Sequence, residues 1–208
     1  MKRALFPTVA ALTLSTLFSI STAFAAVEPA PVFVKRISDT LIARLVNQRA
    51  AYKKNPAVLN QIVQENIEPY VDFDGFARGV MGQFYRQATP AQRTAFAQTF
   101  RQSLIRTYSK GLASYDNESY TIRPFVEGKD PSKAVVNMDF KTDTGTVVPV
   151  AYQLIQNGDS WKLRNLQLNG IDIGLTFRNQ FATAVQANNN NLDLAIKNFI
   201  PSANASGQ

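Results

Sequence analysis

The spacing of apolar residues predicts that the chain begins with two amphipathic helices. Over residues 31–49 the apolar positions recur at steps of three and four, which is the stripe of a helix with one buried face: Val34, Ile37, Leu41 and Leu45. A second helix is predicted from Asn55, a favoured N-cap, to a stop at Pro69. The two together indicate a helical hairpin.

A short apolar segment with three glycines follows at residues 69–82, and it predicts a helix that starts near Asp72. The glycines allow neighbouring elements to approach closely. We interpret Asp72 and Asp74 as capping residues, in preference to catalytic carboxylates. The glycine spacing does not match the G-x-G-x-x-G pattern of dinucleotide sites, and no predicted strand precedes it.

A long helix is predicted to begin at Thr89-Pro90-Ala91-Gln92, which combines a capping box with proline in the first turn. It should extend to about Tyr115. Spacings of three or four bring large apolar residues onto one face: Phe96, Phe100, Leu104, Tyr108, Leu112 and Tyr115. Such a face either packs as ordinary core or lines a cavity, and the spacing leaves both possibilities open.

After residue 118 the apolar positions alternate, which predicts β-strands over 120–126, 133–141, 146–156 and 161–168. The connections are short, so the four strands should form an antiparallel meander with one covered and one wet face. The covered face of the second and third strands comprises Val136, Met138, Phe140, Val148, Val150, Tyr152 and Leu154. Two helices should follow, from about residue 171 to a break at 188–191 and then to Phe199, before a loose tail from residue 202.

The first residues have the pattern of a secretory signal peptide. Lys2 and Arg3 precede a mostly apolar run over residues 4–20, and Ala23-Phe24-Ala25 forms an A-x-A cleavage site. A membrane anchor is the alternative, but hydroxyl residues interrupt the run and no stop-transfer flank follows it. We therefore expect a signal peptide over 1–25 and one exported domain over 26–208.

Composition changes this picture in two ways. Without Lys2 and Arg3, 20 basic residues stand against 15 acidic ones, and the net charge of +5 is spread along the chain. This favours an anionic membrane surface or an acidic protein as partner over nucleic acid. The chain also has no cysteine and no histidine, which excludes a lipoprotein anchor, disulfides, the usual zinc sites and Ser-His or Cys-His catalysis. We expect neither enzyme activity nor a cofactor.

The order of aromatic, glycine and capping residues in the centre of the chain resembles the MlaC family, also called toluene-tolerance proteins. The resemblance is carried by Pro69-Tyr70-Val71-Asp72-Phe73, Val80-Met81-Gly82-Gln83-Phe84-Tyr85-Arg86-Gln87-Ala88-Thr89-Pro90-Ala91-Gln92-Arg93, Phe96, Phe100, Tyr108, Trp161 and Asn169-Gly170-Ile171. It covers most of residues 31–200. It implies an α+β fold of the nuclear-transport-factor-2 type, with a four-stranded antiparallel sheet wrapped by helices and acyl chains held in an apolar cavity between them.

The resemblance further implies a monomeric periplasmic carrier of phospholipid, with no nucleic-acid partner. Such a carrier moves lipid between an outer-membrane lipoprotein complex and an inner-membrane ABC transporter complex with its substrate-binding subunit, and so helps to keep the outer membrane asymmetric. Relatives in the family bind other lipids, such as hopanoids. Two alternatives remain open, a periplasmic adaptor without a ligand and a small enzyme with a carboxylate in its cavity.

We expect the lipid-binding cavity to be lined by the short segment after Asp72, the long helix, the covered sheet face and the helix after residue 171. The candidate lining residues are Phe73, Phe76, Val80, Met81, Phe84, Tyr85, Phe100, Leu104, Tyr108, Val136, Met138, Phe140, Val148, Val150, Tyr152, Leu154, Leu166, Leu168, Ile171, Ile173, Phe177 and Phe181. Arg123 and Arg178 are candidates for contact with a head group at the mouth, or else ordinary surface charges.

Overall fold

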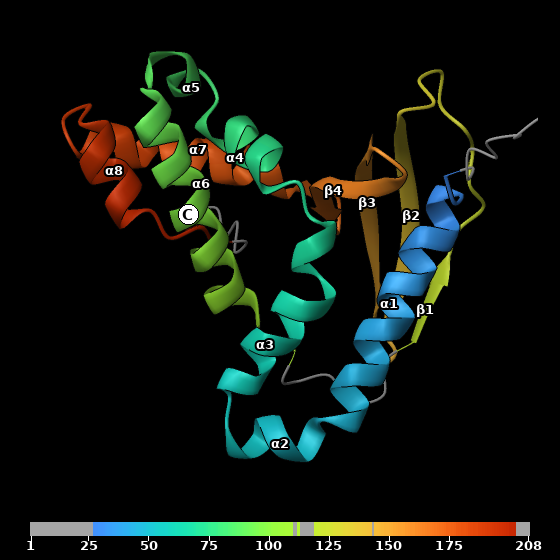
Figure 1. Cartoon of the computed structure of the whole chain (residues 1–208). Coiled ribbons are helices and arrows are strands. Elements are labelled where there is room, and N and C mark those ends of the chain that lie inside the picture. The colour runs from blue at the N-terminus through green and yellow to red at the C-terminus, as the bar shows by residue number, and fades with distance from the viewer. Residues whose placement is uncertain (1–26, 110–111, 113–118, 143, 203–208) are drawn as a thin grey trace, which may run out of the picture.

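The computed structural model describes residues 27–109, 112, 119–142 and 144–202. Helices precede and follow one antiparallel sheet, as an α+β fold requires (Figure 1). The predicted signal peptide, Tyr115 and the end of the predicted tail lie outside the described residues. Among the described residues, no helix is long and apolar enough to cross a membrane.

The sheet has five strands in the order β1-β2-β3-β4-β5, each antiparallel to its neighbours. They are β1 (Ser119–Ile122), β2 (Lys133–Lys141), β3 (Val147–Asn157), β4 (Ser160–Leu168) and β5 (Ile171–Asp172). The predicted count of four was therefore wrong. The fifth strand is only two residues long, too short for alternation to show in the sequence, which predicts the start of a helix at these residues. The first strand also ends earlier than predicted, at Ile122.

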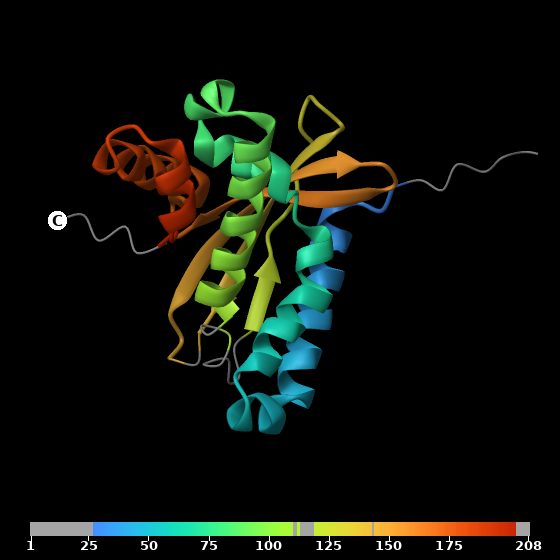
Figure 2. The same ribbon diagram turned by 60° about the vertical axis from the view of Figure 1, so that its left-hand side comes forward.

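Eight α-helices and one 3₁₀ helix lie wholly within the described part of the chain. They are α1 (Ala30–Asn47), α2 (Arg49–Lys54), α3 (Ala57–Asn66), η1 (Glu68–Tyr70), α4 (Phe73–Met81), α5 (Phe84–Gln87), α6 (Pro90–Tyr108), α7 (Ile173–Ala187) and α8 (Leu192–Asn198). The predicted hairpin of two helices has an extra short helix, α2, at its turn. Figure 1 shows α3 between α1 with the sheet on one side and α5, α6 and α8 on the other, and Figure 2 shows α1 and α3 running side by side.

The predicted helix starts are confirmed at two places. The Asp72 carboxylate accepts a hydrogen bond from the Gly75 amide at 2.9 Å and caps α4. At α6, the Thr89 hydroxyl and the Gln92 side chain bond each other's backbone amides, which is a complete capping box. Asp74 was wrongly predicted to cap: it lies exposed in the first turn of α4.

An aromatic core joins α4, α6, α7 and α8. Its fully buried rings pack edge-to-face and stacked, and the closest pair, Phe96 and Phe181, has ring centroids 4.6 Å apart. The other members are Phe76, Phe100, Phe177 and Phe199. Phe96 and Phe100, which begin the aromatic face predicted for the long helix, are therefore core.

Helix α1 covers part of the sheet face that carries the alternating apolar residues. Along β2, Ala134, Val136 and Met138 are buried while Val135 and Asn137 are exposed, so one face is covered and the other is wet. Phe33 and Val34 of α1 pack on this face together with Ala30, Leu154 and Trp161. The predicted alternation on β2 is thereby confirmed.

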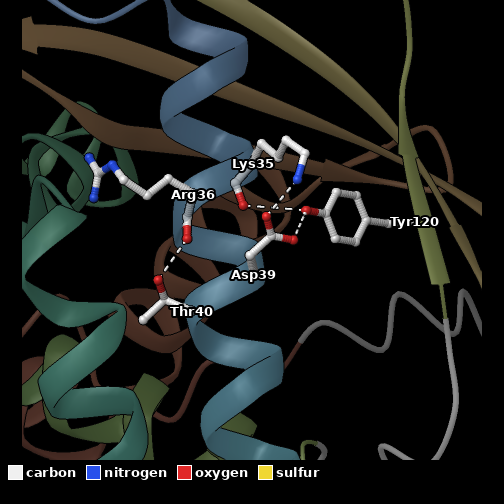
Figure 3. A network of polar contacts seen from close by, with 5 residues as sticks. All are labelled: Lys35, Arg36, Asp39, Thr40 and Tyr120. Atoms are coloured by element: carbon white, nitrogen blue, oxygen red, sulfur yellow. Dashed lines mark hydrogen bonds and ion pairs between the residues drawn. The ribbon is translucent and has the colours of Figure 1, made fainter.

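A polar network also fastens α1 to the edge of the sheet (Figure 3). The Tyr120 hydroxyl on β1 donates to the Asp39 carboxylate on α1 at 2.5 Å, and Lys35 pairs with the same carboxylate at 2.6 Å. Both bonds lower the pKa of the Asp39 carboxyl, and the bond from Lys35 contributes more than the bond from Tyr120. Burial and the bond to Asp39 raise the pKa of Tyr120, so the phenol stays neutral at physiological pH.

Replacing Asp39 with Asn should lower the free energy of unfolding at neutral pH by less than about 1 kcal/mol, because the carboxylate is half exposed. The pKa of Asp39 is lower in the folded than in the unfolded protein, so its contribution is full above about pH 5 and is lost as the pH falls through the folded-state pKa. Urea unfolding of both proteins at several pH values tests this. A difference in stability that grows as the pH falls would contradict it.

Candidate functional site

A hollow of about 370 Å³ lies between the sheet and the helices. Its walls come from α3, α4, α6, α7, β3 and β4, and almost every lining side chain is apolar. The lining residues are Val63, Ile67, Val71, Phe73, Phe76, Leu104, Ile105, Tyr108, Ser109, Leu112, Tyr152, Leu163, Leu166, Leu168, Ile173 and Phe177. Leu168 is the most exposed of them, at 37%, which places the end of β4 nearest to solvent. The volume lies in the range of about 300 to 1,000 Å³ typical of small-molecule sites.

One wall is built where the chain enters α4. Val71 forms a parallel bridge with Leu163 at the free edge of β4, and the Asp72 amide donates to the Leu163 carbonyl at 2.9 Å. The Asp72 carboxylate, besides capping α4, pairs with Arg164 of the same strand. This anchoring sets the direction of α4, so that Phe73 and Phe76 lie against the hollow.

The adjoining wall is set by the start of α7. Asp172 caps this helix through the Leu175 amide at 2.8 Å, and Asn165 of β4 donates to the same carboxylate at 2.9 Å. The Gly174 amide in turn donates to the Asn165 side-chain oxygen at 2.9 Å. The first turn of α7 is therefore fixed to the sheet, and the next buried positions, Ile173 and Phe177, reach the hollow.

A second hollow of about 90 Å³ lies beside the first, under α1. Both hollows are lined by Ile67, Val71, Tyr152 and Leu163, so these four side chains stand between them. The smaller space is otherwise bounded by apolar residues of α1 and β3, with Ser38 and Tyr70 at its margin. The site as a whole is thus an apolar space with two adjoining branches.

Tyr152 brings a polar group to the junction of the two branches. Its hydroxyl makes no hydrogen bond to the residues that the structure describes, and burial raises its pKa to about 12. The phenol is therefore neutral at any physiological pH and can donate one hydrogen bond to a ligand. No group of His, Cys, Asp or Glu that could hold a metal ion occurs among the described residues.

Some of the predicted lining residues do face the larger hollow: Phe73, Phe76, Leu104, Tyr108, Tyr152, Leu166, Leu168, Ile173 and Phe177. The others lie away from it. Val80, Met81, Phe100 and Phe181 are buried in the aromatic core, with Phe84 and Tyr85 packed against it, and Val136 lies beneath α1. Met138, Phe140, Val148 and Val150 share the covered sheet face farther along, Leu154 lines only the smaller hollow, and Ile171 is exposed.

The sequence prediction missed the contribution of α3 to the wall. Val63 and Ile67 were placed in a helix with an apolar face, but nothing in the spacing showed that this helix crosses over the sheet. Leu163 was missed because a register shift between Gln153 and Leu154 brings it opposite Leu154. Neither candidate for the mouth lines the hollow: Arg123 pairs with Asp139 at 2.8 Å, and Arg178 donates to the Gly79 carbonyl at 2.7 Å.

Comparison with known protein families agrees with this geometry: the model of the MlaC protein family matches residues 35–199 of the chain. The chain belongs to the MlaC family. The toluene tolerance protein ttg2D of Pseudomonas putida is 37% identical over 164 residues, which cover 78% of this chain and 76% of that protein. The intermembrane phospholipid transport system binding protein MlaC of Haemophilus influenzae is 22% identical over 145 residues, 68% of each chain.

Among solved structures, a phospholipid-binding protein of Ralstonia solanacearum in complex with a phospholipid has the same fold. The TM-score is 0.74 and the identity 26%, over 83% of this chain and 94% of that one. The resemblance to the MlaC family seen in the sequence, and the α+β fold with an antiparallel sheet that it implied, are thus confirmed.

Proposed function

We propose that this MlaC-family chain is a phospholipid carrier that holds acyl chains in the two-branched apolar space. The observation that carries the proposal is the hollow of about 370 Å³ beneath the helices, with a lining that is almost free of polar groups. The smaller branch under α1 offers a second apolar space beside it.

The energetics of lipid transfer explain why the walls must be apolar. A diacyl lipid has about 30 methylene groups, and each costs about 0.8 kcal/mol in water, so a free lipid lies about 24 kcal/mol above its buried state. A carrier must therefore cover nearly all of both chains. If its cavity matches a bilayer closely, lipid passes either way, and direction has to come from the proteins to which it binds.

The relatives support this function and extend it. The Haemophilus protein is named as the binding protein of an intermembrane phospholipid transport system, and the Ralstonia protein holds a phospholipid. We infer that this chain moves phospholipid through the periplasm, between an outer-membrane lipoprotein complex and an inner-membrane ABC transporter complex, after export by the signal peptide over 1–25. In this role it maintains the lipid asymmetry of the outer membrane.

The proposed carrier does not alter its ligand. The chain has no histidine or cysteine, and among the described residues no Asp or Glu lines the larger hollow. The Tyr152 phenol, with its raised pKa, is suited to orient a lipid ester by a hydrogen bond and unsuited to act as a base near pH 7. A hopanoid or another apolar lipid fits the same lining chemistry, which makes identification of the natural ligand the decisive experiment.

Extraction of the protein purified from periplasm should release phospholipid in stoichiometric amount. The apolar lining would retain a lipid through purification, because its release into water is so unfavourable. Organic extraction followed by mass spectrometry measures the amount and class of lipid, and intact-protein mass spectrometry gives the number bound. Recovery of no lipid would favour the adaptor alternative. Recovery of a hopanoid would show that the protein is a lipid carrier whose ligand is not a phospholipid.

A further inference from the structure

A second concave site lies on the outer side of α4 and α7, away from the apolar hollow. It measures about 770 Å³, and three exposed arginines surround it: Arg78 on α4, Arg86 on α5 and Arg178 on α7. Phe84 and Ala182 contribute apolar surface to the same groove, which the buried Met81 also lines. We call this site the arginine groove.

The arginines of this groove have no carboxylate partner among the described residues. Arg178 instead donates to the Gly79 carbonyl at 2.7 Å. Arg78 lies over the Tyr85 ring at 5.1 Å, and the nearby Arg93 lies over the same ring at 4.4 Å. These contacts hold the guanidinium groups of Arg178 and Arg78 in place and leave their charge uncompensated.

The backbone conformation at Gly82 makes room for the Arg178 side chain. Gly82 has φ of +54°, a conformation that side chains rarely adopt, and a Cβ there would lie 3.2 Å from the Arg178 Cδ. The glycine lets the Arg178 stem lie flat across the end of α4. The guanidinium is therefore held at the groove by α4 itself and does not extend freely into solvent.

We propose that the arginine groove docks an acidic segment of a partner protein, one that carries an apolar side chain between its carboxylates. Guanidinium groups bind carboxylates through paired hydrogen bonds, and the apolar floor accepts the side chain between them. A flat membrane surface fits less well, because a bilayer reaches only the rim of a concave site. In addition, none of the groove residues is an exposed large apolar side chain of the kind that inserts into lipid.

The location of the groove gives such docking a consequence. Helices α4 and α7 contribute Phe73, Phe76 and Phe177 to the apolar hollow, and Arg78 and Arg178 to the groove on the opposite side of the same pair. A docked partner would lie one layer of helix away from the hollow. The inference does not depend on the proposed ligand, since the groove exists whether or not the hollow contains lipid.

Binding of a labelled synthetic peptide of alternating Glu and Leu to the exported chain tests this proposal, by fluorescence anisotropy at low and high salt. The groove variant is Arg78→Glu with Arg86→Glu, which leaves Arg178 and its bond to Gly79 intact. Its control is Lys53→Glu with Lys54→Glu, an exposed pair on α2 with the same change of charge. The groove variant should weaken binding at least about tenfold and the control by less than about twofold.

Two results would overturn the proposal. Equal losses in the groove variant and the control would show a general effect of net charge, with no site. Tight binding to phosphatidylglycerol vesicles that depends on Arg78 and Arg86, with weak binding to the peptide, would assign the groove to a membrane surface instead. Normal lipid content in the groove variant is expected in every case, so this test stands apart from that of the carrier function.

Discussion

Tyr152→Glu should abolish the retention of phospholipid while the protein still folds. Tyr152 lines both branches of the apolar space, so a carboxylate at this position meets the acyl chains directly. In the empty protein the carboxylate can be solvated by water that enters the hollow, whereas in the loaded protein it must be buried in hydrocarbon. Its cost therefore falls mainly on the bound state, and we expect co-purified lipid to fall at least about tenfold.

Val150→Glu is the matched control, because it places the same charge on the same face of the same strand, two residues away. Val150 is 8% exposed, is opposite Met138 in the sheet and does not line the hollow. The carboxylate would have no water to reach. It should lower the free energy of unfolding by about 3 kcal/mol or more, a fall of roughly 10 °C in the melting temperature for a chain of this size.

Thermal unfolding and quantification of co-purified lipid, made on both variants, decide between the two positions. For Tyr152→Glu we expect loss of lipid with a small change in melting temperature. For Val150→Glu we expect a large fall in melting temperature with little loss of lipid per folded molecule. If Tyr152→Glu retains its lipid, the acyl chains do not occupy this junction. If it fails to fold, Tyr152 is core and the hollow is not the binding site.

The contrast between these two neighbours shows what the sequence could and could not predict. Alternation along β3 correctly placed Val150 and Tyr152 on one covered face, because successive side chains of a strand point to opposite faces of the sheet. Alternation does not show what covers each position. That depends on the crossing of α1 and α3 over the sheet, and such packing between segments distant in the chain leaves no local pattern.

The same distinction applies to the helices. Capping residues acted locally, so the starts of α4 and α6 were predicted from Asp72 and from the Thr89 box. The sequence predicted that the apolar residues of α6 share one face, but not that this face serves two places. Phe96 and Phe100 join the aromatic core, while Leu104 and Tyr108 line the hollow. The sequence singled out Arg178 only as a possible head-group contact and did not indicate the arginine groove, because its three arginines come from three helices.

Phe181→Ala should be among the most destabilising single changes in the chain, with little effect on the lipid bound per folded molecule. The Phe181 ring is fully buried and contacts Phe84, Phe96 and Phe199, with centroids 6.0, 4.6 and 5.3 Å away. Removing it leaves a void that these rings cannot fill without losing their mutual packing, so we expect a loss of about 3 to 5 kcal/mol in the free energy of unfolding.

Leu166→Ala provides the comparison at the wall of the hollow. Leu166 already borders empty space, so truncating it enlarges an existing cavity and removes fewer packing contacts, and the cost should stay under about 2 kcal/mol in delipidated protein. Urea unfolding of delipidated samples measures both values, and lipid analysis of untreated samples measures retention. A larger cost for Leu166→Ala than for Phe181→Ala would mean that the hollow is closed and packed in solution.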